Sequence, residues 1–355
     1  MVYYIRFLKT PRLQKQKAGT FSASALICIT TDLGDALLAQ DHDLLVTLRL
    51  ASNGEPVCQE RLHWQGSKRE LPVALGPLPG SIVRQLIIME ITSHDPPTAR
   101  SDSLLNQQDI PLVMSGWSAP FGGPQSEVAD KLIERRFRVN QTVELGIWEE
   151  TGNSIARHIW DAAVASVVYL QRLVAGDQLS SNMVLRSLLR SERRGPLHVI
   201  ELGSGCGIVG IALAALLPQC SVLLTDLPEV EEIVSKNIAA ARPAQSSGLQ
   251  YRPLEWEEEL PADLFETPSI DLVLVSDCTY NADSLPALVS VLSRLLKLSP
   301  HALILVALKR RHQSERIFFD LMKSAGLESL NVDRMNLPSQ YDECDEIELH
   351  CYGRQ

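Results

Sequence analysis

The second half of the chain alternates short, continuous apolar runs with longer segments whose apolar residues recur at helical spacing. This pattern predicts strands at 197–202, 221–225, 249–254, 271–276 and 302–308. It predicts helices between and after them at 209–217, 230–241, 285–296 and 313–325. A further helix is predicted upstream, capped by Asn153 or Ser154 and continued by Ile155, Ile159, Ala163 and Val167.

Repeated strand–helix units predict a parallel sheet with helices on both faces. Two late predicted strands, 327–332 and 346–352, have no clear helix between them, which indicates an antiparallel end to the sheet. Five parallel strands plus such a hairpin is the layout of Rossmann-like methyltransferases, whereas a dehydrogenase has a sixth parallel strand. We therefore expect an α/β domain of the methyltransferase type over residues 137–355.

The first part of the chain has a different pattern. Residues 1–95 are β-leaning, with apolar runs at 25–29, 44–48 and 82–91 separated by turn signals such as Asn53-Gly54. Residues 96–136 are rich in Pro, Gly, Ser, Asp and Gln, which predicts a linker or long loop. Residues 137–148 then favour an extended or hairpin segment at the start of the second domain.

Composition narrows the class of protein. Of 355 residues, 45% are hydrophobic, enough for a substantial core. The net charge of −10 argues against a nucleic-acid partner, although the first 17 residues carry five basic side chains and no acid. We expect no membrane span and no secretory signal. The seven cysteines form no CxxC pair, so we expect no metal site and reduced thiols in the cytoplasm or nucleus.

The strongest chemical signal is the glycine loop Glu-Leu-Gly-Ser-Gly-Cys-Gly at 201–207, between a predicted strand and a predicted helix. Glycines at such a turn let the backbone approach a ligand closely. Gly205, Gly207 and Gly210 fit the dinucleotide fingerprint, in which backbone amides meet a pyrophosphate. Alternatively, Gly203, Gly205 and Gly207 pack under the amino-acid part of S-adenosylmethionine. A glycine turn that has lost its ligand is the remaining interpretation.

Two carboxylates bear on this choice. Asp226 ends the next predicted strand, where it can accept hydrogen bonds from the ribose hydroxyls of either cofactor. Glu201 directly precedes the glycines, where an acid would repel a pyrophosphate but attract a sulfonium or an ammonium group. Glu201 therefore favours S-adenosylmethionine.

The carboxyl ends of later strands supply further candidates, because ligands of such sheets bind at that edge. Trp256 follows the third strand and could lie against an adenine, although core packing is equally compatible with its position. Asp277 and Tyr280 follow the fourth strand and could hold an amine. Asp283 and Ser284 are better placed than Asp277 to cap the next helix, and Cys278 fits a packed thiol better than a nucleophile.

Taken together, these segments carry a family resemblance: 160–163 (Trp-Asp-Ala-Ala), the glycine loop, Asp226, Trp256 and 277–280 (Asp-Cys-Thr-Tyr). Over about 145–352 the chain resembles the family-16 seven-β-strand protein-lysine methyltransferases, with the valosin-containing-protein lysine methyltransferase and its fungal relatives as the nearest likeness. The first 135 or so residues lie outside the resemblance.

The resemblance implies roles for individual residues. Trp160 would contact the cofactor, and Gly203, Ser204 and Gly205 would hold its methionine part. Asp226 would bind the ribose and Trp256 would lie beside the adenine. Ser276 stands where relatives often have alanine. Without the resemblance, Trp160 would count only as a core position of a helix. The complete expected cofactor set is Trp160, Glu201, Gly203, Ser204, Gly205, Gly207, Asp226, Trp256 and Ser276, and the expected catalytic residues are Asp277 and Tyr280.

The predicted activity is therefore transfer of a methyl group from S-adenosylmethionine to a lysine side chain of a protein substrate. We expect a single in-line displacement in which Asp277 holds the amine and water takes its proton. Three alternatives stay open: a methyltransferase for a small molecule or another side chain, an NAD-binding enzyme, and a non-catalytic interaction module.

Overall fold

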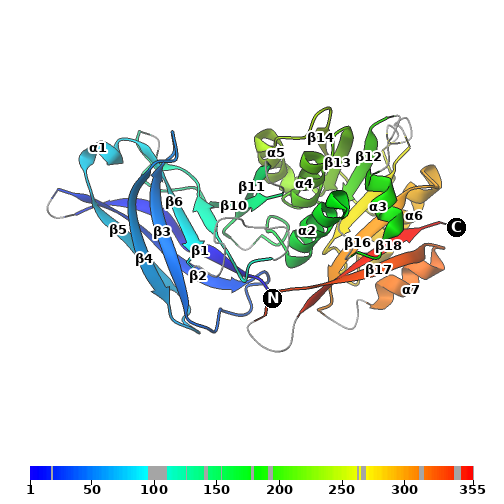
Figure 1. Cartoon of the computed structure of the whole chain (residues 1–355), viewed down its shortest axis with the longest axis horizontal. Helices are drawn as coiled ribbons and strands as arrows, with labels where there is room; N and C mark the ends of the chain where they lie inside the picture. Colours follow the sequence, from blue (N-terminus) through cyan, green and yellow to red (C-terminus); the bar gives the residue numbers. More distant parts are fainter. Residues whose placement is uncertain are drawn as a thin grey trace.

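The chain folds into an amino-terminal body of strands and a carboxyl-terminal body of alternating strands and helices, which pack side by side (Figure 1). The computed structural model describes all residues except 17–18, 95–109, 125, 140–142, 153, 177–179, 191–194, 262–263, 265–268, 312–315, 340–344 and 355. Within the described residues, no helix has the length and apolar character needed to cross a membrane.

The carboxyl-terminal body is built on one seven-stranded sheet. Its strands are β12 (Leu197–Leu202), β13 (Cys220–Asp226), β14 (Gly248–Pro253), β15 (Leu272–Ser276), β16 (Leu303–Lys309), β17 (Glu328–Asn336) and β18 (Glu346–Gly353). The strand order is β14-β13-β12-β15-β16-β18-β17. The first five strands pair in parallel, and β18 pairs antiparallel with both β16 and β17. The predicted parallel sheet with an antiparallel end is thus confirmed.

Helices cover both faces of this sheet because successive strand residues point to opposite sides. The helices are α2 (Asp161–Ala175), α3 (Met183–Arg190), α4 (Ile208–Leu216), α5 (Glu231–Ala240), α6 (Leu285–Leu298) and α7 (Arg316–Ser324), with a short 3-10 helix η1 (Pro228–Val230) before α5. In β15, Leu272 and Leu274 join the core that includes α2 and α4, whereas Val273 and Val275 join the core that includes α6 and α7. The sequence did not predict α3.

The helix predicted from Asn153 or Ser154 begins later, at Asp161, with Trp160 as its N-cap residue. Asn153 lies outside the described residues, and Ser154 precedes a non-helical segment. The backbone N–H of Ile159 donates to the buried carboxylate of Glu149 at 2.8 Å, so a side chain rather than a helical carbonyl satisfies this amide. The helical spacing of Ile155 and Ile159 was therefore misleading.

The amino-terminal body consists of two sheets. One has the order β5-β2-β1-β7, from β1 (Tyr3–Lys15), β2 (Phe21–Thr31), β5 (Leu71–Leu78) and β7 (Val113–Met114). The other contains β3 (His42–Leu50), β4 (Pro56–Trp64), β6 (Leu86–Ser93), β8 (Gly116–Ser118), β9 (Phe121–Gly122), β10 (Leu132–Arg138) and β11 (Glu144–Glu150). Phe7 and Ile27 of the first sheet share a core with Val46 and Met89 of the second. The basic first residues thus form a strand, and the short helix α1 (Gly80–Val83) delays the strand predicted at 82–91.

The linker predicted over 96–136 is wrong for the residues that the structure describes there. Strands β7, β8, β9 and the start of β10 lie in this range and pair with the amino-terminal sheets. Strands β7, β8 and β9 are only two or three residues long, so they are too short to show a strand period in the sequence. The hairpin predicted at 137–148 exists as β10 and β11, but it belongs to the amino-terminal body, which extends to Glu150.

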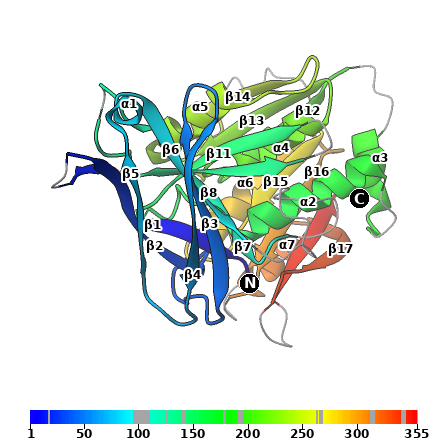
Figure 2. The same ribbon diagram turned by 60° about the vertical axis from the view of Figure 1, so that its left-hand side comes forward.

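The two bodies share packing and hydrogen bonds. Tyr4 and Phe137 of the strands belong to the same apolar core as Val164 of α2. Strand β11 also lies against α5 (Figure 2). There the Asn237 side chain accepts from the backbone N–H of Trp148 at 2.8 Å and donates to the Trp148 carbonyl at 2.9 Å. Apolar packing and hydrogen bonds thus hold the two bodies together.

Candidate active site

The glycine loop joins β12 to α4 in a tight turn. Gly203, Gly205 and Gly207 have φ angles of 65°, 54° and 79°, a region that side chains rarely adopt. A Cβ on Gly203 would lie 2.4 Å from the Cys278 sulfur and 3.4 Å from a ring carbon of Trp256. The loop therefore needs glycine for its conformation, and Trp256 packs against it. The position of Trp256 beside an adenine stays a prediction.

Asp226 and Ser204 give the loop its polar groups. The Asp226 carboxylate accepts hydrogen bonds from the Gly205 N–H and the Leu227 N–H, both at 2.7 Å. The Ser204 hydroxyl is buried and has no hydrogen-bond partner within the described part of the chain. A buried polar group of this kind indicates a ligand that completes the loop. The loop, Asp226 and Trp256 thus fit a nucleoside cofactor.

Glu201 lies beneath the loop at the amino-terminal end of α4. Its side chain is buried, and one carboxylate oxygen accepts from the Gly210 N–H at 2.8 Å. Gly210 thus belongs to the helix and binds a side chain of the protein. Burial raises the pKa of Glu201 from its ordinary 4.5 to about 8, although the Gly210 hydrogen bond opposes the shift. The predicted attraction of Glu201 to the cofactor's positive groups stays a prediction.

The raised pKa of Glu201 makes stability depend on pH in the cofactor-free protein. Between pH 4.5 and 8 the folded protein holds a proton on Glu201 that the unfolded chain lacks, so stability falls as pH rises through this window. Glu201→Gln should flatten that fall, because glutamine keeps an acceptor for Gly210 and does not titrate. Thermal unfolding measured from pH 5 to 8.5 tests this, with the exposed Glu257→Gln as the control. A wild-type pH slope in Glu201→Gln would contradict the assignment.

Asp277 follows β15 and sits in the left-handed region, at φ 55°. Its backbone N–H donates to the Ala307 carbonyl at 2.8 Å, and its buried carboxylate accepts from Arg311 at 2.6 Å. An aspartate held in this sparsely populated conformation at a strand end is a strained position of the kind found at functional sites. Helix α6 begins at Leu285 with Ser284 as N-cap residue, so Asp277 has no capping role there.

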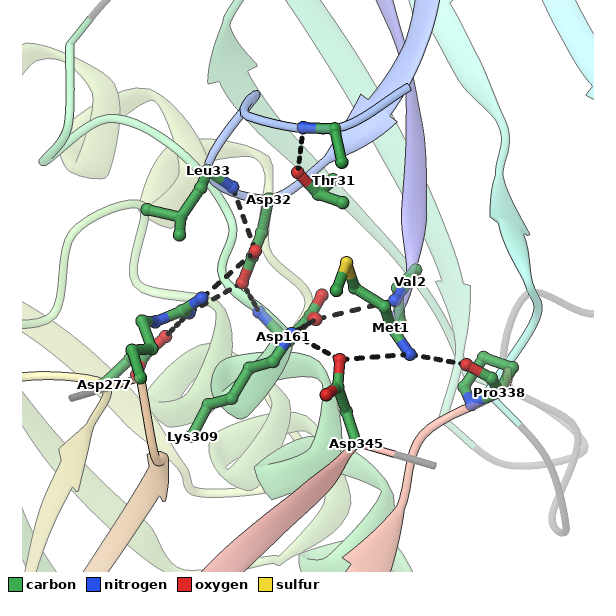
Figure 3. Close-up of polar contacts among 12 residues, drawn as sticks. Met1, Val2, Thr31, Asp32, Leu33, Asp161, Asp277, Lys309, Pro338 and Asp345 are labelled. Carbon is green, nitrogen blue, oxygen red and sulfur yellow. Dashed lines mark hydrogen bonds and ion pairs between the residues drawn. The ribbon is translucent and has the colours of Figure 1, made fainter. Parts of the chain in front are cut away.

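Arg311 connects Asp277 to the amino-terminal body. The same guanidinium nitrogen that binds Asp277 lies 2.7 Å from a carboxylate oxygen of Asp32, a residue that directly follows β2. The second Arg311 terminal nitrogen is 3.3 Å from the other Asp32 oxygen, so the pairing is bidentate. Asp32 also accepts from the Asp161 N–H at 3.3 Å, at the start of α2 (Figure 3). Asp32, Arg311 and Asp277 form what we call the interdomain triad.

The pKa values of the two carboxylates in the interdomain triad are shifted in opposite directions. Burial raises the pKa of Asp277, and the charge and hydrogen bond of Arg311 only partly oppose it. Burial also works against the charged form of Asp32, but there the hydrogen bond and charge of Arg311 outweigh it and lower the pKa. Asp277 is thus the more readily protonated of the two carboxylates.

A cavity of about 480 Å³ opens beside the interdomain triad. Trp160, Asp277 and Tyr280 line it, so the structure brings together three of the predicted site residues. The Trp160 ring stands 5.5 Å from the Arg311 guanidinium carbon, and its N–H donates to the Ile155 carbonyl at 3.2 Å. The tryptophan therefore faces the site rather than the interior of α2.

The remaining predicted residues lie at the expected strand ends. The Ser276 hydroxyl is 3.4 Å from the Ser166 hydroxyl of α2. Cys278 is buried against the glycine loop, and burial raises the pKa of its thiol, so it is a packed thiol. No cluster of three or more His, Cys, Asp or Glu side chains suited to a metal occurs among the described residues.

Sequence reasoning missed Asp32 and gave Arg311 no role. Arg311 follows β16, so its position at a carboxyl strand edge was a usable signal. Asp32 lies far from the other site residues in sequence, and nothing in its local pattern points to a site.

Comparison with known proteins decides the family. The family model for lysine methyltransferases matches residues 139–325, which include every predicted site residue. The chain belongs to the lysine methyltransferase family. With the glycine loop, Asp226 and Trp256 placed as described, this methyltransferase uses S-adenosylmethionine as its methyl donor, and the NAD and non-catalytic alternatives fall away.

Curated relatives agree with this placement. A UPF0665 family protein of Schizosaccharomyces pombe is 29% identical over 89% of this chain and 91% of its own length. The Protein N-lysine methyltransferase METTL21A of Danio rerio is 29% identical over 59% of this chain and 83% of its own. The Protein-lysine N-methyltransferase EFM6 of Saccharomyces cerevisiae is 31% identical over 35% of this chain and 54% of its own. The finer likeness to the valosin-containing-protein enzyme stays a prediction.

Proposed function

We propose that this methyltransferase modifies the side-chain amine of a lysine in a protein substrate. The observation that carries the proposal is the placement of Asp277, a buried carboxylate, with Tyr280 and Trp160 around one cavity. Relatives whose names specify protein lysine as the acceptor support it.

The cofactor would lie over the glycine loop, with its adenine beside Trp256 and its ribose at Asp226. S-adenosylmethionine supplies a methyl group on a sulfonium: the lysine nitrogen's lone pair forms the new bond as the carbon–sulfur bond breaks, and sulfur keeps the bonding electrons. The residues of this chain mainly align the amine and support its charge.

The acceptor lysine must lose a proton first, because its ordinary pKa is about 10.4. The interdomain triad carries two carboxylates and one guanidinium, and Arg6 also lines the cavity, so these charges balance when both carboxylates are ionised. Asp277 can then hold a neutral amine through its carboxylate oxygen. Removal of the ammonium from bulk water then favours its neutral form. Asp277 would hold the amine, Tyr280 would line its path, and water would accept the proton.

Incubation of the full chain with radiolabelled S-adenosylmethionine and a lysate of cells that lack the enzyme tests this function. We expect label in a protein band, and mass spectrometry should place it on a lysine as N-methyllysine. Label confined to small molecules or to another side chain would overturn the proposed acceptor. We also propose a cytoplasmic or nuclear location, which the free thiols of the six described cysteines support, and no nucleic-acid partner.

A further inference from the structure

We propose that the amino-terminal body forms one wall of the acceptor site and selects a target lysine that has a large apolar residue beside it in the substrate. This inference rests on the proposed function, because it assigns a specificity surface to the same site. The selecting surface consists of Leu8 and Leu33, and we call these two residues the apolar wall.

The cavity beside Asp277 is shared between the two bodies. Arg6 and Leu8 of β1, Cys28 and Thr30 of β2, and Leu33 of the following loop line one side of it. Trp160, Asp277 and Tyr280 line the other side. The family model begins at residue 139, so the first side comes entirely from residues outside the matched region. The acceptor site of this chain therefore has a wall that the matched region alone does not supply.

Four of the residues that line this cavity are large, apolar or aromatic, and exposed. Leu8 is 52% exposed, Leu33 51%, Ile155 58% and Tyr280 59%. All four residues line the same cavity, although they come from four separate segments of the chain. Large apolar side chains gathered around one opening, with charged groups inside, are the arrangement of a protein interaction site.

The interior of the cavity indicates which part of a substrate enters. Asp277 and Asp32 share the guanidinium of Arg311, and Arg6 also lines the cavity, so these charges balance when both carboxylates are ionised. A volume of about 480 Å³ lies within the usual range for ligand pockets, roughly 300–1,000 Å³, and exceeds what the slim chain of one lysine fills. The neutral amine of a lysine, held by Asp277, together with an adjacent large apolar side chain fits this lining and this volume.

The ion pair between Asp32 and Arg311 also holds the amino-terminal body at the site. Asp32 binds Arg311 through both carboxylate oxygens, and Leu33 is the next residue along the chain. The Leu33 N–H donates to an Asp32 oxygen at 2.9 Å, so the Leu33 part of the apolar wall is tied to the interdomain triad (Figure 3). An apolar residue beside the acceptor lysine would thus contact Leu33 while the lysine amine lies at Asp277.

The test uses the full chain and, as substrate, the protein labelled in the lysate experiment. The enzyme variants are Leu8→Ser, Leu33→Ser and their combination. The matched control is Leu330→Ser on the edge strand β17, an exposed leucine that does not line the cavity. The substrate variant replaces the large apolar neighbours of the target lysine with serine. Methyl transfer, S-adenosylmethionine affinity and thermal unfolding are measured for each.

We expect the combined enzyme variant to lose about tenfold or more in kcat/KM, mainly through KM, with unchanged cofactor affinity and unfolding temperature. Leu330→Ser should behave as wild type. The serine-substituted substrate should lower kcat/KM of the wild-type enzyme by a similar factor. When the combined enzyme variant acts on this substrate, the total loss in kcat/KM should be smaller than the product of the two separate factors, because both changes remove the same contact. Wild-type kcat/KM in the combined variant, independent losses, or a target lysine without a large apolar neighbour would overturn the inference. If wild-type enzyme binds S-adenosylmethionine but labels no protein, the proposed function fails and this inference fails with it.

Discussion

Asp277→Asn should lower methyl transfer by about a hundredfold or more and leave the affinity for S-adenosylmethionine within about twofold. The variant replaces the buried carboxylate that follows β15, binds Arg311 and lines the acceptor cavity. Asparagine keeps a side-chain oxygen for Arg311 but removes the charge that attracts and holds the acceptor amine. Initial rates on the labelled protein substrate and calorimetric titration of the cofactor separate the two effects.

Asparagine is the appropriate replacement because of the backbone at this position. Asp277 has a φ of 55°, and asparagine tolerates the left-handed region nearly as well as aspartate, whereas alanine does not. Asp277→Ala should also abolish transfer, but it combines loss of charge with backbone strain. Asp283→Asn is the matched control, because Asp283 is exposed and lies outside the cavity. Transfer at a wild-type rate by Asp277→Asn would show that the acceptor amine is held elsewhere.

Arg135→Met should destabilise the protein by about 3–5 kcal/mol, the cost of leaving a buried partner charge uncompensated. Arg135 on β10 is fully buried and donates to Glu149 of β11 at 2.7 Å. It also donates to the carbonyls of Ser115 and Ile5, each at 2.8 Å. One side chain thus connects β10 to both sheets of the amino-terminal body. Urea unfolding followed by circular dichroism measures the loss.

Neighbouring residues supply the controls for this prediction. Arg136→Met changes the next residue, whose guanidinium is partly exposed and pairs with Glu134, so it should cost no more than about 1 kcal/mol. Arg135→Met combined with Glu149→Gln should be less destabilising than the two single losses added together, since the uncompensated charge is then removed. A cost for Arg135→Met as small as for Arg136→Met would contradict the structural role of the buried pair.

The sequence predicted the carboxyl-terminal body well because its elements are long and strongly patterned. Buried parallel strands form continuous apolar runs, and β12 lies where the pattern placed it, at Leu197–Leu202. Prediction was poorer where a tertiary contact overrides local spacing. The carboxylate of Glu149 binds the Ile159 amide and holds the preceding residues outside α2, and no local pattern encodes that contact.

By itself, the amino-acid sequence determined the methyltransferase sheet, the glycine loop and the strand-end residues Asp226, Trp256, Asp277 and Tyr280. These features depend on local periodicity and on short motifs whose residues are close in the chain. Only the tertiary structure decided that short strands between 113 and 138 extend the amino-terminal body, and that Asp32 reaches Arg311 across 279 positions of sequence. The physical reason is that a bidentate ion pair depends on the distance between two side chains in space. The packing of the two bodies sets that distance, and neither the sequence around Asp32 nor the sequence around Arg311 encodes it.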